Sequence, residues 1–441
     1  MLGLLARAGH EIVPEEQADV VLVNTCSFIG DATSESVRTI LELAGSGKKL
    51  VVTGCLAQRH PADLYESLPE VSAFLGTSDF DRIVEVVQRV EEGERFNAVT
   101  PLPLVGAAIL NKDLPRLFTG LGPSAYLKIA EGCDHSCSFC IIPQMRGRYI
   151  SRERPAILRE ARQLAAAGVK ELVLIAEDTT RYGQKETGKF RLAALLHDLA
   201  EIDGIEWIRI LYAYPNYMTQ ELLEAVRDVP KVVKYLDMPL QHTHPDVLRA
   251  MRRPRHEPPA ELVARMRATV PGLVIRTTLI VGFPGETPEH VDHVLEFLSL
   301  ERLDHVGAFA YSPEKGTPAA DLKPTVAKRE RNHRRRLVME AQQEVSRALH
   351  EGLVGQTLDC LIEAIDVKTG AALGRTYRDA PEIDGTTYVT GDPAALPGDI
   401  VPIRITRTGP YDLYGEVARD EGSQARGPRS DSRRSRTGQE R

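Results

Sequence analysis

The sequence predicts a multidomain α/β protein with an amino-terminal parallel α/β domain, a central partial (β/α)6 barrel and a small carboxy-terminal antiparallel β-barrel. Three observations lead to this prediction. A chain of 441 residues is too long for one ordinary hydrophobic core. Short apolar runs alternate with helical stretches over most of the length, which is the pattern of parallel sheets. Near the carboxyl end the runs become short, β-rich and broken by Gly, Pro and Asp, as in small barrels.

Composition limits the classes of protein to consider. Hydrophobic residues make up 42% of the chain, enough to form cores, and the formal net charge of −7 gives no overall indication of binding to nucleic acid, including DNA. No apolar run approaches the roughly 18 residues of a membrane helix, and the first residues lack the features of a signal peptide. Six cysteines are too few for a disulfide scaffold, and three are crowded together. We therefore expect a cytoplasmic protein without membrane association that uses cysteines as ligands.

We assign residues 1–97 to the amino-terminal domain. Apolar runs predict strands at 20–25 and 50–54, and amphipathic patterns predict helices at 34–43 and 80–92. The chain opens with a helix at 1–8, closed by Gly9, although a sheet of this kind usually begins with a strand. We expect that the first strand of this domain is missing from the sequence.

After a Pro- and Gly-rich linker at 98–124, strands and helices alternate again over residues 125–350. The six predicted strands are 126–130, 172–176, 207–213, 235–240, 274–281 and 305–311. Six βα units form an incomplete barrel that is open on one side, and ligands of such folds bind at the carboxyl ends of the strands. A long basic helix at 326–350 ends this core. The small β-barrel follows at 352–419, and an Arg-rich tail at 420–441 is predicted to be disordered.

Three cysteines follow the first predicted barrel strand, in the segment EGCDHSCSFC (131–140). Cys133, Cys137 and Cys140 are spaced closely enough to converge on one metal centre. A zinc site requires a fourth ligand, which His135 could supply. A [4Fe–4S] cluster usually takes four thiolates, so three would leave one iron open to a further ligand. The spacing alone leaves both a structural zinc site and a reactive iron–sulfur site open.

The spacing C-x3-C-x2-C, with the aromatic Phe139 before the last cysteine, resembles the signature of the radical S-adenosylmethionine (SAM) superfamily. The resemblance implies that the three cysteines hold a [4Fe–4S] cluster whose open iron chelates the amino and carboxylate groups of SAM. It also implies that one electron from the cluster cleaves SAM to a 5′-deoxyadenosyl radical, which abstracts hydrogen from an unactivated carbon. We expect Phe139 to contact the cofactor.

Two further segments are expected to contact SAM because of this resemblance. The segment TLIVGFPGE (278–286) ends the fifth barrel strand in a turn whose glycines allow close approach of the backbone to a ligand. The expected contacts there are Gly282, Pro284, Gly285 and Glu286. Glu177 ends the second strand, where the superfamily often contacts the amino group of SAM. The alternatives are an ordinary strand-to-helix turn for the first segment and a helix cap for Glu177.

Cys26 and Cys55 each follow a predicted strand of the amino-terminal domain, in VNTCSFI and VVTGCLAQ. A lone cysteine is usually a small buried hydrophobic residue, but two at equivalent strand ends favour a site. Both segments resemble the methylthiotransferase family, which places a second, auxiliary [4Fe–4S] cluster on three cysteines of this domain. The resemblance implies that Cys26 and Cys55 are the second and third ligands and that the first would precede Met1. Either the recorded start is too far downstream, which we favour, or the second cluster is incomplete. Cys360 is interpreted as a core residue of the terminal barrel.

Two branches of the methylthiotransferase family fit these motifs. One modifies adenosine in tRNA, and the other modifies the β-carbon of an aspartate in small-subunit ribosomal protein S twelve. The segments that resemble the second branch are CIIP (140–143), RG (146–147), SR (151–152), DMPLQH (237–242), DAPEIDG (379–385) and YDLYG (411–415).

The charge of the terminal barrel bears on the same choice. Residues 352–419 hold ten acidic and six basic side chains, a net charge of −4. An RNA-binding barrel should be basic, whereas an acidic barrel suits a basic ribosomal protein. A solvated surface without a partner is the alternative. It is also the alternative for the basic run 328–336, which could instead touch ribosomal RNA.

The resemblance thus implies a radical SAM methylthiotransferase in which one SAM supplies the methyl group and another supplies the radical. Its implied partners are ribosomal protein S twelve or the small ribosomal subunit, and an electron donor such as flavodoxin or ferredoxin. The enzymatic alternative is the tRNA methylthiotransferase, and the other alternative is a noncatalytic, cluster-binding ribosome factor. The sequence predicts no catalytic side chain and no residue that docks the substrate aspartate.

Overall fold

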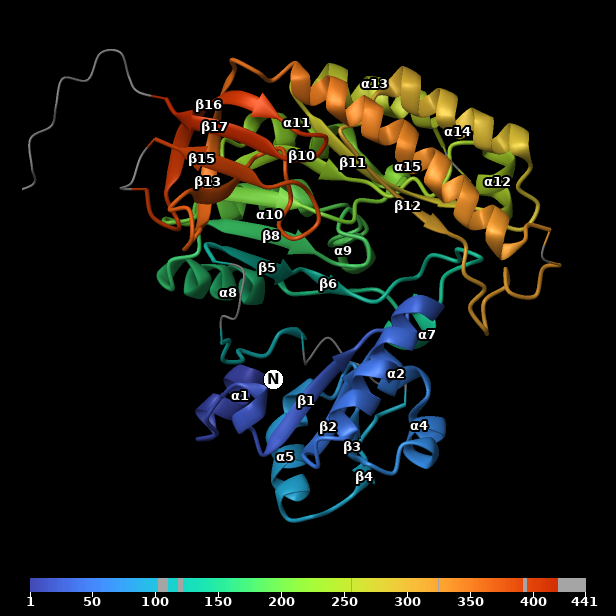
Figure 1. Ribbon diagram of the computed structural model, residues 1–441, viewed down its shortest axis with the longest axis vertical. Coiled ribbons are helices and arrows are strands. Elements are labelled where there is room, and N and C mark those ends of the chain that lie inside the picture. Colours follow the sequence, from blue (N-terminus) through green and yellow to red (C-terminus); the bar gives the residue numbers. More distant parts are fainter. Residues whose placement is uncertain (102–109, 118–121, 255, 324, 392–394, 419–441) are drawn as a thin grey trace, which may run out of the picture.

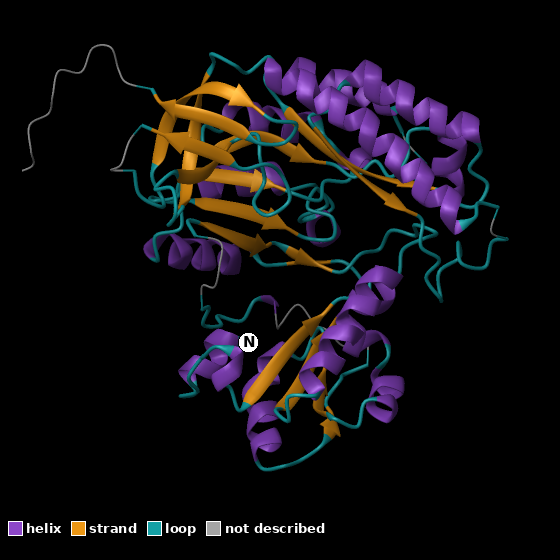
Figure 2. Cartoon of the chain, viewed as in Figure 1, coloured by secondary structure: helices purple, strands orange, loops and turns teal. Residues whose placement is uncertain are grey.

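The computed structural model describes residues 1–101, 110–117, 122–254, 256–323, 325–391 and 395–418. The chain forms three parts, a small α/β domain, a central open barrel and a terminal closed barrel (Figure 1; Figure 2). The predicted tail at 420–441 lies wholly outside the described residues, and the predicted linker at 98–124 lies partly outside them. Among the described helices, none combines the length and apolar character needed to cross a membrane.

The amino-terminal domain is a parallel sheet flanked by helices, as predicted. Its strands lie in the order β1-β2-β3-β4, and Thr25 of β1 pairs with Gly54 of β2. The strands are β1 (Val20–Thr25), β2 (Lys49–Gly54), β3 (Val71–Leu75) and β4 (Phe96–Asn97). The helices are α1 (Leu2–Arg7), α2 (Gly30–Ala44), α3 (Cys55–Arg59), α4 (Pro61–Ser67) and α5 (Ile83–Glu91). The sequence analysis missed β3 and β4, which are short and lie between turns.

The central domain is a six-stranded parallel sheet in the order β12-β11-β10-β9-β8-β5, which confirms the predicted open barrel. The strands are β5 (Ser124–Lys128), β8 (Glu171–Ile175), β9 (Trp207–Ile210), β10 (Val232–Asp237), β11 (Val274–Val281) and β12 (His305–Ala310). β9 ends before the predicted position 213. Its extended backbone cannot continue because Tyr212 adopts a φ of 58°.

Helices cover the outer face of this sheet, and short elements occupy its loops. The outer helices are α8 (Arg154–Ala166), α10 (Leu192–Ala200), α11 (Gln220–Asp228), α12 (Pro245–Ala250), α13 (Pro259–Thr269) and α14 (Pro288–Glu301). The loop elements are β6 (Ala130–Glu131), α7 (Ile142–Arg146), β7 (Ile150–Ser151) and α9 (Gln184–Thr187). In α10 the buried Leu192, Leu195, Leu196 and Leu199 follow the spacing of one helix face, so the sequence pattern itself turns this face to the core.

A long helix, α15 (Lys328–Glu351), connects the open barrel to the terminal barrel. The terminal strands close in the order β13-β14-β15-β17-β16, and all pairings are antiparallel except the parallel pair β15–β17. They are β13 (Thr357–Ile365), β14 (Ala372–Thr376), β15 (Thr387–Thr390), β16 (Ile400–Thr408) and β17 (Leu413–Val417). Cys360 is fully buried in the core of this barrel.

A buried ionic network joins the terminal barrel to the central sheet. The Glu171 carboxylate on β8 accepts hydrogen bonds from Arg209 Nε at 2.7 Å and from Arg375 Nη2 at 2.6 Å. Glu171 and Arg209 are fully buried, and the Arg375 side chain is 3% exposed. Burial opposes ionisation of Glu171, but Arg375 and Arg209 outweigh it and lower its pKa to about 2. The charges are therefore buried as a compensated set, which fixes the terminal barrel against the sheet.

The amino-terminal domain contacts the central domain through a few polar groups. Arg59 of α3 forms an ion pair with Glu314 at 2.9 Å and donates to the Lys315 carbonyl at 3.2 Å. The Thr77 hydroxyl donates to the Met145 carbonyl at 3.0 Å. These contacts bring the carboxyl ends of β1 and β2 toward the loop that holds the crowded cysteines.

Candidate functional site

The three crowded cysteines lie in one loop, between β6 and α7, beyond the carboxyl end of the first barrel strand. Cys133 and Cys137 are buried, and Cys140 is half-buried. Backbone hydrogen bonds fix this loop, from Cys133 N to the Gly147 carbonyl and from Ser138 N to the Met251 carbonyl. These bonds hold the loop at two points along its length.

Two hydrogen-bond donors, which favour the thiolate form, contact sulfur atoms of this loop. Arg253 Nη1 donates to Cys137 Sγ at 3.3 Å, and the His135 backbone N–H donates to Cys133 Sγ at 3.4 Å. Burial raises the pKa of the Cys133 and Cys140 thiols to about 12. Such thiols become thiolates only when positive charge replaces the lost solvent, and iron would supply it.

The environment of His135 argues against the zinc alternative. Its Nε2 lies 2.7 Å from Asp178 Oδ2, and its ring stacks on Tyr214 with centroids 3.9 Å apart. Thiolates on one Zn²⁺, each about 2.3 Å from the metal, lie about 3.8 Å apart. Within the described ranges, no group of three potential ligand atoms closer than 4.8 Å contains a cysteine sulfur. The wider spacing suits a cluster in which each thiolate binds a different iron.

A cavity of about 480 Å³ adjoins the three cysteines at the carboxyl ends of the strands. Polar atoms with no hydrogen-bond partner are buried in residues of its wall, namely Glu177 Oε2, Gln241 Oε1 and Arg253 Nε. Buried polar groups normally have partners, so these atoms mark where a polar ligand fits. The predicted contacts Phe139 and Glu177 both line this cavity. Burial raises the pKa of Glu177, and the nearby Glu131 carboxylate raises it further.

The GFPGE turn lies outside this wall. The described residues that line the cavity include none of Gly282, Pro284, Gly285 and Glu286. The Glu286 carboxylate instead accepts a hydrogen bond from Gly282 N at 2.8 Å and pairs with Arg334 at 2.9 Å. A Cβ at Gly282 would lie 2.2 Å from the Arg331 side chain, so this glycine is required by α15. The role of the turn in SAM binding therefore stays a prediction.

Cys26 and Cys55 follow paired residues of β1 and β2, so adjacent strands present them side by side. Cys26 is exposed and Cys55 is half-buried. Arg146 Nη2 donates to Cys55 Sγ at 3.4 Å, and Arg146 Nη1 pairs with Glu131 at 3.3 Å. Arg146 and Phe28 also line the cavity beside the other cysteines. The cavity beside Cys133, Cys137 and Cys140 is therefore bordered by residues next to the amino-terminal cysteines, although neither Cys26 nor Cys55 lines it. The assignment of these two ligands stays a prediction.

Several cavity residues were missed by the sequence analysis. They are Lys128, Arg146, Tyr212, Gln241 and Arg253. Gln241 lies in the DMPLQH segment noted above, and its φ of 72° is a strained conformation that no sequence pattern reveals. Arg253 is 116 residues from Cys137, so only the fold brings it to the sulfur.

Gly132 directly precedes Cys133 and has a backbone conformation that favours glycine, so its replacement tests whether this turn is needed for iron binding. Its φ is +76°, and a Cβ would lie 2.4 Å from the Arg148 carbonyl oxygen. We expect Gly132→Ala to cost at least about 1–2 kcal/mol from the backbone alone and to lower iron loading per chain. Gly188→Ala is the matched control, because Gly188 has a φ of +74° with no atom within 4 Å of a Cβ. Equal iron content in the two variants would contradict the prediction.

Comparison with known proteins agrees with this geometry. Residues 127–298 match the radical SAM superfamily, 354–418 match the TRAM domain, and 1–76 match the uncharacterized protein family UPF0004. A Synechocystis protein named "Ribosomal protein uS12 methylthiotransferase RimO" is 49% identical over 95% of this chain and 94% of its own length. A Microcystis aeruginosa protein of the same name is also 49% identical, with the same coverage.

Among solved structures, the radical SAM methyltransferase TsrM from Kitasatospora setae, with cobalamin and a [4Fe–4S] cluster bound, has a similar fold. The TM-score is 0.51 at 16% identity, over 69% of this chain and 64% of that one. The likeness extends to the fold alone. The level of identity to the curated proteins, over nearly the whole of both chains, decides the family: this chain belongs to the RimO family of ribosomal protein uS12 methylthiotransferases.

Proposed function

We propose that the chain is a radical SAM methylthiotransferase that adds a methylthio group to the β-carbon of an aspartate in ribosomal protein uS12. The observation that carries the proposal is the cavity beside Cys133, Cys137 and Cys140, whose wall includes Arg146, the residue that donates a hydrogen bond to Cys55 Sγ. A reaction that both activates a carbon and delivers sulfur needs both centres within reach of one substrate. The relatives, whose names specify uS12 methylthiotransferase, support the substrate.

The chain's own residues have distinct parts in this scheme. Cys133, Cys137 and Cys140 would hold a [4Fe–4S] cluster that, once bound, supplies the electron for SAM cleavage. Glu177 and Gln241 offer unpartnered oxygens for the polar groups of SAM, and Phe139 lines the wall beside them. The half-exposed Tyr212 covers part of the same wall. We propose that these groups bind and orient SAM and exclude water from the reacting carbon.

The structure weakens the argument that the acidic terminal barrel selects a basic protein partner. Asp379 and Asp384 of the terminal barrel are buried in the joint with the central domain. Asp384 forms an ion pair with Arg276, and the carboxylates of Asp379 and Asp384 each lie within 4 Å of a ring nitrogen of His305. Glu363 pairs with Arg375 in the same joint. Much of the negative charge of the terminal barrel is therefore neutralised by ion pairs within the protein. The choice of uS12 over tRNA as substrate thus rests mainly on the relatives. An electron donor such as flavodoxin or ferredoxin, and a cytoplasmic location, complete the proposal.

A direct test uses the reconstituted full chain with SAM, a reductant and either recombinant uS12 or tRNA. We expect mass spectrometry to find one methylthio group on a single aspartate of uS12, and no modified adenosine. Modified tRNA with unmodified uS12 would favour the tRNA branch of the family. Absence of 5′-deoxyadenosine with both substrates would favour a noncatalytic factor.

Arg146 provides a sharper test of the two-centre arrangement, because it contacts both Cys55 and Glu131. We expect Arg146→Gln to lower methylthio transfer about 10–100-fold, the usual effect of removing a group that supports metal ligands. SAM cleavage should continue, because Arg253 rather than Arg146 contacts the SAM-binding cysteines. Measurement of 5′-deoxyadenosine and modified uS12 in the same reaction checks this. Equal loss of both products would contradict it.

A further inference from the structure

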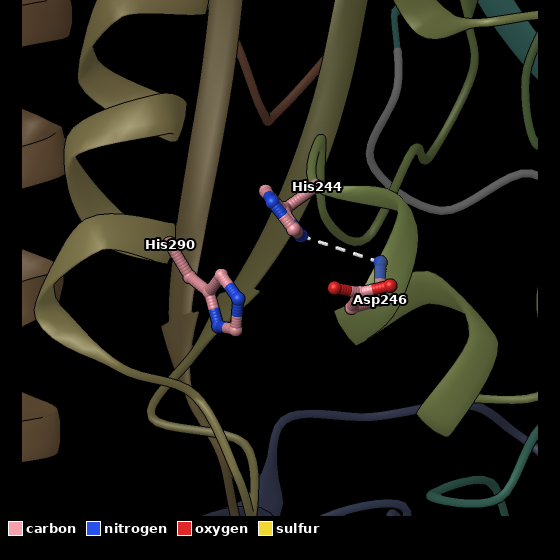
Figure 3. A group of neighbouring side chains, drawn as sticks. All are labelled: His244, Asp246 and His290. Atoms are coloured by element: carbon pink, nitrogen blue, oxygen red, sulfur yellow. Dashed lines mark hydrogen bonds between the residues drawn. The ribbon is translucent and has the colours of Figure 1, made fainter.

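A group of histidines lies outside the cavity, where two loops at the carboxyl ends of β10 and β11 meet. His244 and Asp246 begin α12, and His290 lies in the first turn of α14. Figure 3 shows the imidazoles of His244 and His290 and the Asp246 carboxylate turned toward a common space. Ligand atoms of these three side chains all lie within 4.8 Å of one another. In the described part of the chain, this is the one group of three such side chains with that spacing.

The geometry points to a binding site for one divalent transition-metal ion on His244, Asp246 and His290. Two imidazoles and one carboxylate form a mixed N/O set, which suits Zn²⁺, Fe²⁺ or Ni²⁺ better than Mg²⁺ or Ca²⁺. A spacing below 4.8 Å is within reach of a single ion, because metal–N and metal–O distances are each about 2.0–2.2 Å. Asp246 is exposed and the two histidines are half-buried, so the ion could enter from solvent and keep water ligands.

Three imidazole rings lie close together at this place. The centroid of the His244 ring lies 4.2 Å from that of the His290 ring and 5.1 Å from that of the His293 ring. Burial and the neighbouring His244 imidazole lower the pKa of His290 and His293. Neutral imidazole is the form that binds a metal, and the Asp246 carboxylate, which also accepts a hydrogen bond from Arg249 at 2.7 Å, would supply negative charge beside it.

The hydrogen bonds of the two rings are compatible with metal at Nδ1. His244 Nδ1 accepts from Asp246 N, and His290 Nδ1 accepts from Thr287 N, both at a long 3.2 Å. Each Nδ1 therefore carries a lone pair, and the proton of each neutral ring is on Nε2. A metal would replace two weak capping bonds by two coordinate bonds. Thr243, whose hydroxyl lies 2.8 Å from His293 Nδ1, fixes the loop between them.

A metal here would tie together two loops that border the cavity. Residues 238–244 connect β10 to α12 and contain Gln241, whose Oε1 is buried without a partner. Residues 282–287 connect β11 to α14, and Glu286 in them lies 3.5 Å from the buried His242. An ion at this position would hold both loops in one arrangement, so its effect extends to the wall of the cavity.

The test measures zinc binding to the cluster-loaded full chain under anaerobic conditions. The double variant His244→Asn/His290→Gln removes both imidazoles, while Asn and Gln retain the capping hydrogen bonds of α12 and α14. His197→Ala, at an exposed position of α10, is the matched control. By equilibrium dialysis and elemental analysis, we expect wild type and control to bind one zinc beyond their iron content. The double variant should bind it at least tenfold more weakly.

X-ray absorption at the zinc edge identifies the ligands in the same samples. We expect nitrogen and oxygen scatterers with no sulfur, and competition by Ni²⁺ but not by Mg²⁺ or Ca²⁺. Three results would overturn the proposal: sulfur in the zinc shell, equal binding by the double variant, or no zinc bound beyond the iron content. None of these results depends on methylthio transfer, so failure here leaves the proposed function untouched.

Discussion

Replacement of Cys137 with alanine is expected to abolish SAM cleavage, lowering the rate of 5′-deoxyadenosine formation by roughly a thousandfold or more. Cys137 supplies one of only three thiols in the loop, and Arg253 donates to its sulfur at 3.3 Å. Loss of one of three ligands leaves two thiolates, too few to retain the cluster. The measurements are iron and sulfide content and 5′-deoxyadenosine after reduction.

Cys360→Ala is the matched control for this experiment. Cys360 is fully buried in the core of the terminal barrel, away from both sets of cysteines. Its truncation should cost about 1–2 kcal/mol of stability and leave iron content unchanged. Retention of cluster and SAM cleavage in Cys137→Ala would refute the assignment of the crowded cysteines. Loss of iron in Cys360→Ala would show that iron loading reports on folding alone.

Glu171→Gln is expected to destabilise the joint between the central and terminal barrels by about 3–5 kcal/mol, the usual cost of removing one partner of a buried ion pair. The substitution leaves Arg209 fully buried without its carboxylate. Trp207, the only tryptophan, lies in the apolar cluster that includes Leu361 of the terminal barrel. Its fluorescence during urea unfolding therefore reports on this joint.

The control is Glu416→Gln on the terminal barrel, which removes an ion pair to Arg404 whose side chains are 45% and 59% exposed. We expect a change below about 1 kcal/mol there. Because the folded state lowers the pKa of Glu171 to about 2, its contribution is complete above the ordinary value of 4.5. It is lost as pH falls from there toward 2. A similar unfolding midpoint for both variants would contradict the role of Glu171.

The sequence predicted those parts of the fold that depend on local periodicity. The strands 20–25 and 274–281 agree in full with β1 and β11, because unbroken apolar runs between turns leave no alternative. The end of β9 was missed because the φ of Tyr212 depends on tertiary contacts, among them the hydrogen bond from its N–H to Asp237. The parallel pair β15–β17 was also missed, since strand direction in a barrel is set by the path of its connections.

The candidate site likewise contains residues that the sequence predicts and residues that only the fold brings together. The crowded cysteines were predictable because their ligands lie within eight residues of sequence. Arg146, Arg253 and Gln241 were not, since a cation or amide on a loop has no pattern until the fold places it beside a sulfur or a cavity. The histidine group is a further example, because His244 and His290 are 46 residues apart and meet only through parallel strands that end at the same edge.

The two joints of the central barrel differ in a way that bears on how a folded substrate is admitted. The terminal barrel is joined to the central sheet by buried ion pairs, among them Arg375 with Glu171 and Asp384 with Arg276. The amino-terminal domain is attached through a smaller set of polar contacts, among them the Arg59–Glu314 ion pair and the hydrogen bond from Thr77. Among the described residues, fewer buried ion pairs join the amino-terminal domain than join the terminal barrel, so we expect the domain that carries Cys26 and Cys55 to move at the lower free-energy cost. Such a motion would let a folded substrate approach the cavity while the central barrel and the terminal barrel stay joined.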